Sequence, residues 1–251
     1  FISLDNKGLS SLDGLSQDRK DTIVPATIVF QQLLSVINSP SFIISNRGLR
    51  EGVIIQHLNQ EHNDPYDLYS VQQQTILRLS SQYNIQEIAT NQRITIADML
   101  LNELEKNNLL TVDMRHLELL FYGATLYNLG NYIENDSSSQ HTFYIISNTN
   151  ITGGHHVARV RLALLASYKN RTLYNQYLSN LDGWYSKDEE ILLMKLGSII
   201  KFAEALNDVH VNSVLDLTLK PNKKDGYDLT VTYSGNIISE DYRAHKQLNH
   251  F

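Results

Sequence analysis

Cysteine is absent from this chain of 251 residues. Its absence excludes disulfide bonds and thiolate metal sites, and it is compatible with a reducing compartment, so we expect a cytoplasmic protein. Proline and glycine are also scarce, with four and twelve residues. Because few residues interrupt the periodic apolar patterns, the sequence predicts a fold that is mixed but mainly α-helical.

Long apolar runs and an excess of positive charge are missing as well. No stretch approaches the roughly 18 apolar residues that span a bilayer, and residues 1–4 (FISL) have neither the basic segment nor the apolar core of a signal peptide. The formal net charge is −6, and an acidic chain binds polyanions poorly unless arginine, lysine and histidine cluster locally. We therefore expect no membrane partner and no nucleic-acid partner.

Residues 1–56 combine helical and extended patterns. Apolar residues recur at helical spacing over residues 28–37, and Pro40 follows the end of that helix because proline cannot continue it. Residues 42–44 (FII) form a short candidate strand, and a turn and a second helix follow over residues 45–58. A helix–strand–turn–helix unit of this kind is typical of an α/β domain.

Residues 57–208 are predicted to be helical. Four apolar faces recur at helical spacing, and such faces bury against one another in an all-α domain. The four faces begin at Ile94, Leu117, Val160 and Leu192.

Residues 209–251 change to an alternating pattern. Residues 214–219 (VLDLTL) and 227–233 (YDLTVTY) alternate apolar with polar side chains, and the stretch PNKKDG separates them. This pattern predicts a β-hairpin with a longer loop. Ser239, followed by two acidic residues, is a typical helix start. The pattern therefore predicts a β-hairpin followed by a helix, with a boundary near residue 208.

Several short sequence motifs, called words below, resemble those of a known family. Residues 14–25 (GLSQDRKDTIVP) are similar to the family word GLSxxRxDxIVPG, and residues 45–53 (SNRGLREGV) are similar to SxRGLREGV. Residues 141–148 (HTFYIISN) are similar to HSxYILxNS. In this order the words resemble the C-terminal part of the exopolyphosphatase/guanosine pentaphosphatase family, over essentially the whole chain.

The resemblance implies an architecture for the three parts. Residues 1–56 would be the C-terminal piece of an actin-like (ribonuclease H-like) α/β domain, residues 57–208 an HD-like helical domain, and residues 209–251 a small α/β tail domain.

The resemblance also implies an activity. Members of this family release terminal phosphate from inorganic polyphosphate or guanosine pentaphosphate, use Mg²⁺ as cofactor and are commonly homodimers. Their catalytic carboxylate and glycine-rich phosphate loops belong to a region with words such as DxGSxS and DxGGGS, and neither word occurs in this sequence. The resemblance therefore implies that the general base and the Mg²⁺ ligands lie outside these residues, and that this part alone is inactive.

Residues 47–51 are the strongest candidates for phosphate binding. Gly48 permits a tight turn, and the helix that follows offers unpaired amides. Arg47 and Arg50 can each hold phosphate oxygens with a planar guanidinium group, while Glu51 could pair with an arginine or orient a water. The alternative is that Arg50 and Glu51 form structural salt bridges.

A metal-binding HD site is not expected. Such a site needs a histidine, an adjacent His-Asp pair and a later aspartate as ligands. Where the family often has LHExG or LHDxG, residues 126–130 read LYNLG; the expected first histidine falls near residues 89–91 (ATN), and residues 168–170 read YKN instead of YHR. Tyrosine and asparagine are poor ligands, so we predict no metal site in this part.

Basic residues of the helical part form a weaker candidate site. They could provide a track for a long polyanion, and the alternative is an ordinary solvated helix face. The residues concerned are His141, His155, His156, Arg159, Arg161 and Lys169.

Three further interpretations complete the sequence analysis. Arg19 and Asp21 are interpreted as a buried ion pair that fixes the preceding loop, in preference to a catalytic role. The whole chain could instead be a non-catalytic regulatory or dimerisation domain that senses guanosine tetra- or pentaphosphate. An independent HD phosphohydrolase is the weakest reading, and it would need bound metal.

Overall fold

A computed structural model describes residue 4 and residues 6–10, 15–41, 48–61, 68–151, 156–181, 183–207, 213–223 and 226–248. The chain forms two compact units, residues 1–65 and residues 66–251. Within the described ranges, no helix combines the length and the apolar character that crossing a bilayer requires.

The first unit contains helices only, as far as its described residues go. They are α1 (Asn6–Ser10), the 3₁₀ turn η1 (Gln17–Arg19), α2 (Lys20–Val36) and α3 (Leu49–Glu61). Helices α2 and α3 confirm the two helices predicted for this part. The predicted strand over 42–44 and the turn up to residue 47 lie outside the described residues, so the α/β character of this unit stays a prediction.

Helix α2 exposes apolar side chains. It has no buried residue, and Val29, Leu33 and Val36 keep 65%, 51% and 82% of their surface accessible. Because burying such side chains is what normally holds a helix in a domain, α2 is incompletely packed within its own unit.

The second unit is a helical bundle with one hairpin, which confirms the mainly helical prediction. Its helices and strands are α4 (Leu68–Gln82), α5 (Glu87–Lys106), α6 (Met114–Thr125), η2 (Leu129–Tyr132), α7 (Ser138–Asn148), α8 (His156–Ala166), α9 (Arg171–Leu178), α10 (Lys187–Ala205), β1 (Val214–Pro221), β2 (Tyr227–Tyr233) and α11 (Ile238–Gln247).

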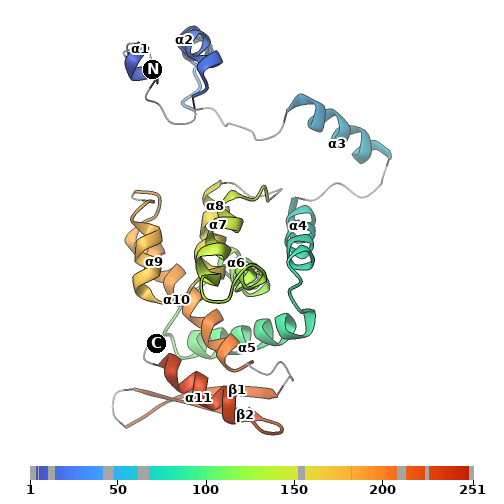
Figure 1. Cartoon of the computed structure of the whole chain (residues 1–251), viewed down its shortest axis with the longest axis vertical. Helices are drawn as coiled ribbons and strands as arrows, with labels where there is room; N and C mark the ends of the chain where they lie inside the picture. The colour runs from blue at the N-terminus through green and yellow to red at the C-terminus, as the bar shows by residue number, and fades with distance from the viewer. Residues whose placement is uncertain are drawn as a thin grey trace. The chain divides into compact units, whose positions relative to one another are not determined.

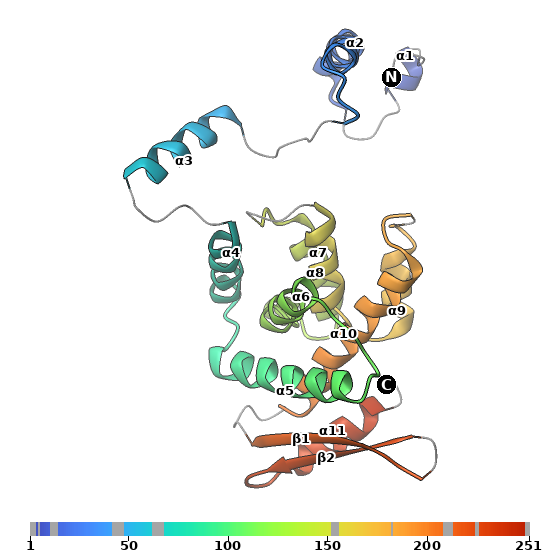
Figure 2. The same cartoon turned by 180° about the vertical axis from the view of Figure 1, so that it is seen from behind.

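Helix α5 is the centre of this unit. It packs against α6 and α10 on one side and against β1 on the other, and both views of the ribbon place it between the hairpin and α6 (Figures 1 and 2). Members of all four predicted apolar faces meet in one core, in which Leu101, Leu164 and Leu196 are completely buried. Ala163 of the third face joins a second core, and Phe121 of the second face is 39% exposed. The helices predicted from periodicity are therefore confirmed.

Three helices of the chain end in the same way. Asn38, Asn84 and Asn108 follow α2, α4 and α5, and each has a left-handed backbone with φ between 51° and 56°. The next residue bonds back to the last turn, as in the 2.9 Å bond from the Ile85 amide to the Ser80 carbonyl. These are Schellman-type ends, in which asparagine takes the place that glycine usually fills.

The predicted hairpin is confirmed, with one irregularity. Strands β1 and β2 pair antiparallel, Leu219 opposite Leu229, and a register shift occurs between Val214 and Asp216. Because a bulge adds one residue to a strand, Val214 and Leu217 are both buried although they are three residues apart.

Side chains of α5 and of Asn107, the residue that follows it, hold the outer edge of β1. The Gln92 amide donates to the Val214 carbonyl at 3.2 Å. The Leu219 amide donates to the Glu103 carboxylate at 2.7 Å, and the Leu219 carbonyl accepts from Asn107 at 3.1 Å. The hairpin therefore belongs to the same compact unit as the helices, while the predicted subdivision near residue 208 stays a prediction.

Acid is expected to loosen the contact between the hairpin and α5. The bond from the Leu219 amide, followed by the one from Lys106, holds the pKa of Glu103 below its ordinary value of 4.5. A lowered carboxylate pKa means that the stabilisation is present above the ordinary pKa and is lost as the pH falls through the folded-state value. The Leu219 amide chemical shift should therefore change in this acidic range. In the variant Glu103→Gln, whose side chain cannot titrate, this pH-dependent change of the Leu219 shift should disappear. If the variant showed the same pH dependence as the unchanged chain, the contact would be ruled out as its cause.

Candidate functional site

The start of α3 places three of the four predicted phosphate-binding residues together. Gly48 precedes the first residue of the helix, and its amide donates to the Glu51 carboxylate at 2.9 Å. This is one half of a capping box, so Glu51 fixes the turn. Arg50 is exposed and has no hydrogen-bond or ion-pair partner among the described residues. Arg47 lies outside them.

The interpretation of Arg19 and Asp21 as a buried ion pair is wrong. Both residues are exposed, and they stand two positions apart where η1 passes into α2. Side chains two positions apart on a helix do not face each other, which explains why no ion pair joins them in this described segment.

The predicted polyanion track falls into two groups. Ser139 donates to the Ser167 carbonyl, and Arg159 donates to the Ser147 carbonyl at 2.9 Å, so α7 and α8 run antiparallel. His156 therefore lies near the end of α7, whereas Lys169, which follows α8, lies near its start. The start and end of an 11-residue helix are about 15 Å apart.

Each group has its own local contacts. A ring nitrogen of His156 bonds the Arg159 guanidinium, and His141 lies 4.0 Å from the Glu134 carboxylate. Lys169 donates to the Asp136 carbonyl at 3.5 Å. His155 lies outside the described residues. Whether these side chains bind a polyanion stays a prediction, and a single continuous track would have to bridge both ends of α7.

Sequence reasoning missed a second lysine beside Lys169. Gly197 of α10 lies against Tyr168, so Lys201, one turn further along the same face, is next to Lys169. Burial first and the Lys169 charge second lower the pKa of Lys201. Neither lysine has a carboxylate partner in the described part of the chain, and two adjacent unbalanced cations favour an anion.

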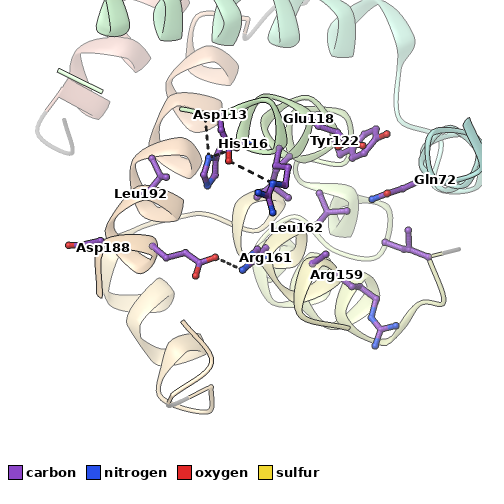
Figure 3. A pocket seen from close by; sticks show the side chains of 15 residues that line it. Gln72, Asp113, His116, Glu118, Tyr122, Arg159, Arg161, Leu162, Asp188 and Leu192 are labelled. Atoms are coloured by element: carbon purple, nitrogen blue, oxygen red, sulfur yellow. Dashed lines mark hydrogen bonds and ion pairs between the residues drawn. The ribbon is translucent and has the colours of Figure 1, made fainter. Parts of the chain in front are cut away.

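A cavity of about 530 Å³ lies between α4, α6, α8 and α10. Arg115, Arg159 and Arg161 line it together with four carboxylates, those of Asp113, Glu118, Asp188 and Glu189. Figure 3 shows the Arg159 guanidinium at the edge of this group, away from Arg161 and His116. The lining is therefore of mixed charge, which does not favour a polyanion.

Three of these groups, Arg161, Glu189 and Asp113, are occupied in structural contacts. Arg161 pairs with Glu189 at 2.5 Å and lies over the Tyr185 ring at 5.5 Å. Asp113 caps α6 by accepting from the His116 amide at 3.0 Å, and this bond lowers the Asp113 pKa. Arg115 contacts only Asp113, at 3.8 Å, so within the described lining it is the arginine most available to a ligand.

An ion pair between the buried Arg93 and Glu204, whose side chain is 25% exposed, lies in a smaller cavity of about 260 Å³. Arg93 is 4% exposed; its Nε is 2.6 Å from the Glu204 carboxylate, and its Nη1 donates to the Ala124 carbonyl at 2.6 Å. The guanidinium carbon lies 5.6 Å from the centre of the Tyr127 ring. Tyr127 donates to the Tyr168 carbonyl at 3.1 Å, and burial raises its pKa.

This smaller cavity coincides with the degenerate HD word. Tyr127 and Asn128, which stand where the family often has histidine and an acid, line it beside Arg93 and Glu204. A fixed guanidinium repels a metal cation at the same place. Among the described residues, no three His, Asp or Glu side chains are grouped so that they could hold a metal ion. These residues therefore do not fit a metal-binding HD site, and the Mg²⁺ ligands that the resemblance implies outside this sequence stay a prediction.

Comparison with protein-family models gives two matches. Residues 1–61 match the Ppx/GppA phosphatase family, and residues 71–250 match domain III of the Ppx/GppA phosphatases. The two matches correspond to the two compact units, and the second covers more than half of the chain. The resemblance seen in the short words is thereby confirmed: this chain belongs to the Ppx/GppA phosphatase family.

Proposed function

We propose that this chain is the C-terminal region of an exopolyphosphatase-like hydrolase, which releases terminal phosphate from inorganic polyphosphate or guanosine pentaphosphate. The observation that carries the proposal is the family match over both units. In this proposal the chain provides arginines that hold phosphate, part of the substrate channel and a dimer contact.

The start of α3 is proposed as the point where a phosphate group is held. The Glu51 carboxylate uses one amide of the turn, and the next amides and the exposed Arg50 guanidinium stay available to an anion. A helix N-terminus and a guanidinium attract the same negative charge. Arg47, the neighbouring arginine of the RGLREG word, is proposed to act with Arg50.

Replacing Arg50 is expected to weaken polyphosphate binding. A hydrogen bond to a charged group contributes about 1.5–3 kcal/mol, so Arg50→Ala should raise the dissociation constant roughly tenfold or more. Isothermal titration calorimetry with inorganic polyphosphate measures this dissociation constant. Arg171→Ala, which removes another exposed arginine at the start of α9, is the matched control and should bind like the unchanged chain. Equal affinities for both variants would contradict the proposed site.

Hydrolysis is proposed to need residues beyond those of this sequence. Neither DxGSxS nor DxGGGS occurs in it, and the described residues do not fit a Mg²⁺ site. We therefore expect the chain to bind polyphosphate without releasing phosphate, and a longer protein that adds both words to release it. Rapid phosphate release by the present chain alone would contradict the proposal that hydrolysis needs further residues.

A non-catalytic role in sensing guanosine tetra- or pentaphosphate is the second candidate function. The Arg93–Glu204 pair favours it, because the pair occupies the cavity that a catalytic HD domain would need for metal. Calorimetry with guanosine tetraphosphate and with polyphosphate separates the two functions. Binding of the nucleotide alone would favour the sensor, and binding of polyphosphate would favour the substrate-channel role.

A further inference from the structure

Two lysines of the helical unit lie close together without a balancing charge. Lys169 follows α8 and is exposed, whereas Lys201 lies near the end of α10 and is partly buried. Gly197, one turn before Lys201, lies against Tyr168, which places Lys201 near enough for the Lys169 charge to act on it. Because like charges repel, this pair is unfavourable as long as both lysines carry their proton.

The acidic groups around this pair have other partners. Glu204, one turn from Lys201 on α10, is 2.6 Å from the Arg93 guanidinium. Lys169 donates to the Asp136 carbonyl at 3.5 Å, and a carbonyl group carries no net charge. Among the described residues, no carboxylate forms an ion pair with either lysine, so none holds the two ammonium groups in their charged form.

Burial acts on Lys201 in the same direction as the neighbouring charge. Gly197, Ser198 and Ala205, which share its side of α10, are buried. Burial first and the Lys169 charge second lower the Lys201 pKa. A lysine amine that has lost its proton is a nucleophile, and desolvation beside a second cation is a recognised way to activate it.

The arrangement also favours one kind of electrophile. An acyl group would leave Lys201 neutral and would give Lys169 no partner. Carbon dioxide would leave a carbamate, whose negative charge can pair with the Lys169 ammonium. Because carbon dioxide is small and uncharged, it can reach a partly buried amine without a counter-ion.

The reaction needs no further reagent. The Lys201 ammonium first releases a proton to water. The amine nitrogen then forms a bond to the carbon of carbon dioxide, one C=O double bond becomes a C–O single bond that carries the negative charge, and the nitrogen releases a second proton to water. The side-chain charge changes from +1 to −1 as two protons leave, so atoms and charge balance, and nothing is oxidised or reduced.

We propose that Lys201 is a modification site at which carbon dioxide forms a carbamate paired with the Lys169 ammonium. The modification converts two repelling cations into an ion pair and removes positive charge from this end of α10. This proposal goes beyond the proposed function and does not rest on it, since it concerns no phosphate group.

Carbon NMR of the full chain in isotopically labelled bicarbonate detects carbamates, and treatment with triethyloxonium converts them into stable esters that peptide mass spectrometry locates. Lys201 should carry several times more label than Lys195, an exposed lysine on the same helix. The α-amino group, whose ordinary pKa is about 7.7–8.0, forms a carbamate of its own and is the positive control in every sample.

Two variants of Lys169 test the pairing, with circular dichroism to show that both are folded. Lys169→Gln should lower the label at Lys201 roughly threefold or more, a factor typical of losing a partly exposed ion pair. Lys169→Arg keeps the charge and should keep the label.

Three outcomes would overturn the proposal. They are label at Lys201 no greater than at Lys195, label unchanged in Lys169→Gln, and saturable binding of inorganic phosphate to the lysine pair without any label at Lys201. The last outcome would assign the pair to a free anion. Because the label is measured without polyphosphate, its failure is distinguishable from a failure of the proposed function.

Discussion

Arg93→Ala is expected to lower the free energy of unfolding of the helical unit by about 3 kcal/mol, the lower end of the range for breaking a buried ion pair, because Arg93 is buried and Glu204 is partly exposed. The guanidinium connects Glu204 of α10 with the Ala124 carbonyl at the end of α6. Its loss leaves both acceptors without this donor. Urea denaturation followed by far-ultraviolet circular dichroism measures the effect.

Two further variants separate the buried charge from simple loss of packing. The double variant Arg93→Met with Glu204→Leu removes both charges and should recover much of the stability, because apolar pairs of similar volume replace buried ion pairs well. Lys106→Ala breaks an exposed pair with Glu103, in which the lysine side chain is 69% exposed, and should cost less than about 1 kcal/mol. A loss in Arg93→Ala no larger than in Lys106→Ala would contradict the role given to the Arg93–Glu204 pair.

Gly130→Ala is expected to destabilise the same unit by about 3 kcal/mol, the upper range for adding a group to a tightly packed site. A Cβ atom at Gly130 would lie 2.2 Å from the Ser138 carbonyl oxygen and 2.8 Å from the Thr142 amide nitrogen. Both are backbone atoms of the first turns of α7, so no side chain can move aside. The bond from the Gly130 amide to the Thr142 hydroxyl, 2.8 Å long, would be strained as well.

Gly226→Ala provides the control for this prediction. A Cβ atom there would meet nothing closer than 3.4 Å, at the Asn222 side chain. Its effect should stay within about 1 kcal/mol, the range seen when alanine replaces glycine in a compatible backbone. Thermal or urea unfolding compares the two variants. Similar unfolding midpoints would show that η2 and α7 do not need their close approach.

The helices and the hairpin were predictable because their signals are local. The spacing of Leu192, Leu196 and Ile199 marks the buried face of α10, and the alternation over 227–233 marks β2. The family words led to Arg50 and Gly48, and the bond between Gly48 and Glu51 follows from the position of Glu51 three residues after Gly48, the residue that precedes the helix.

The tertiary features were not predictable in the same way. Arg93 and Glu204 are 111 positions apart, and no local pattern pairs them. A signal was nevertheless present, since Arg93 stands on the stripe of the buried residues Ala89 and Ala97. A charge on an apolar stripe indicates a buried partner. The division of the polyanion track required the antiparallel direction of α7 and α8, which only packing decides.

The asparagines that end α2, α4 and α5 also affect the unfolded chain. Glycine would adopt the left-handed backbone more easily, but it would give the denatured ensemble more conformational entropy to lose on folding. Asparagine at Asn38, Asn84 and Asn108 costs some backbone strain in the native state. In the denatured state it has fewer backbone conformations available than glycine would have. A chain with few glycines can therefore stop its helices sharply while keeping the entropic cost of folding low at these three junctions.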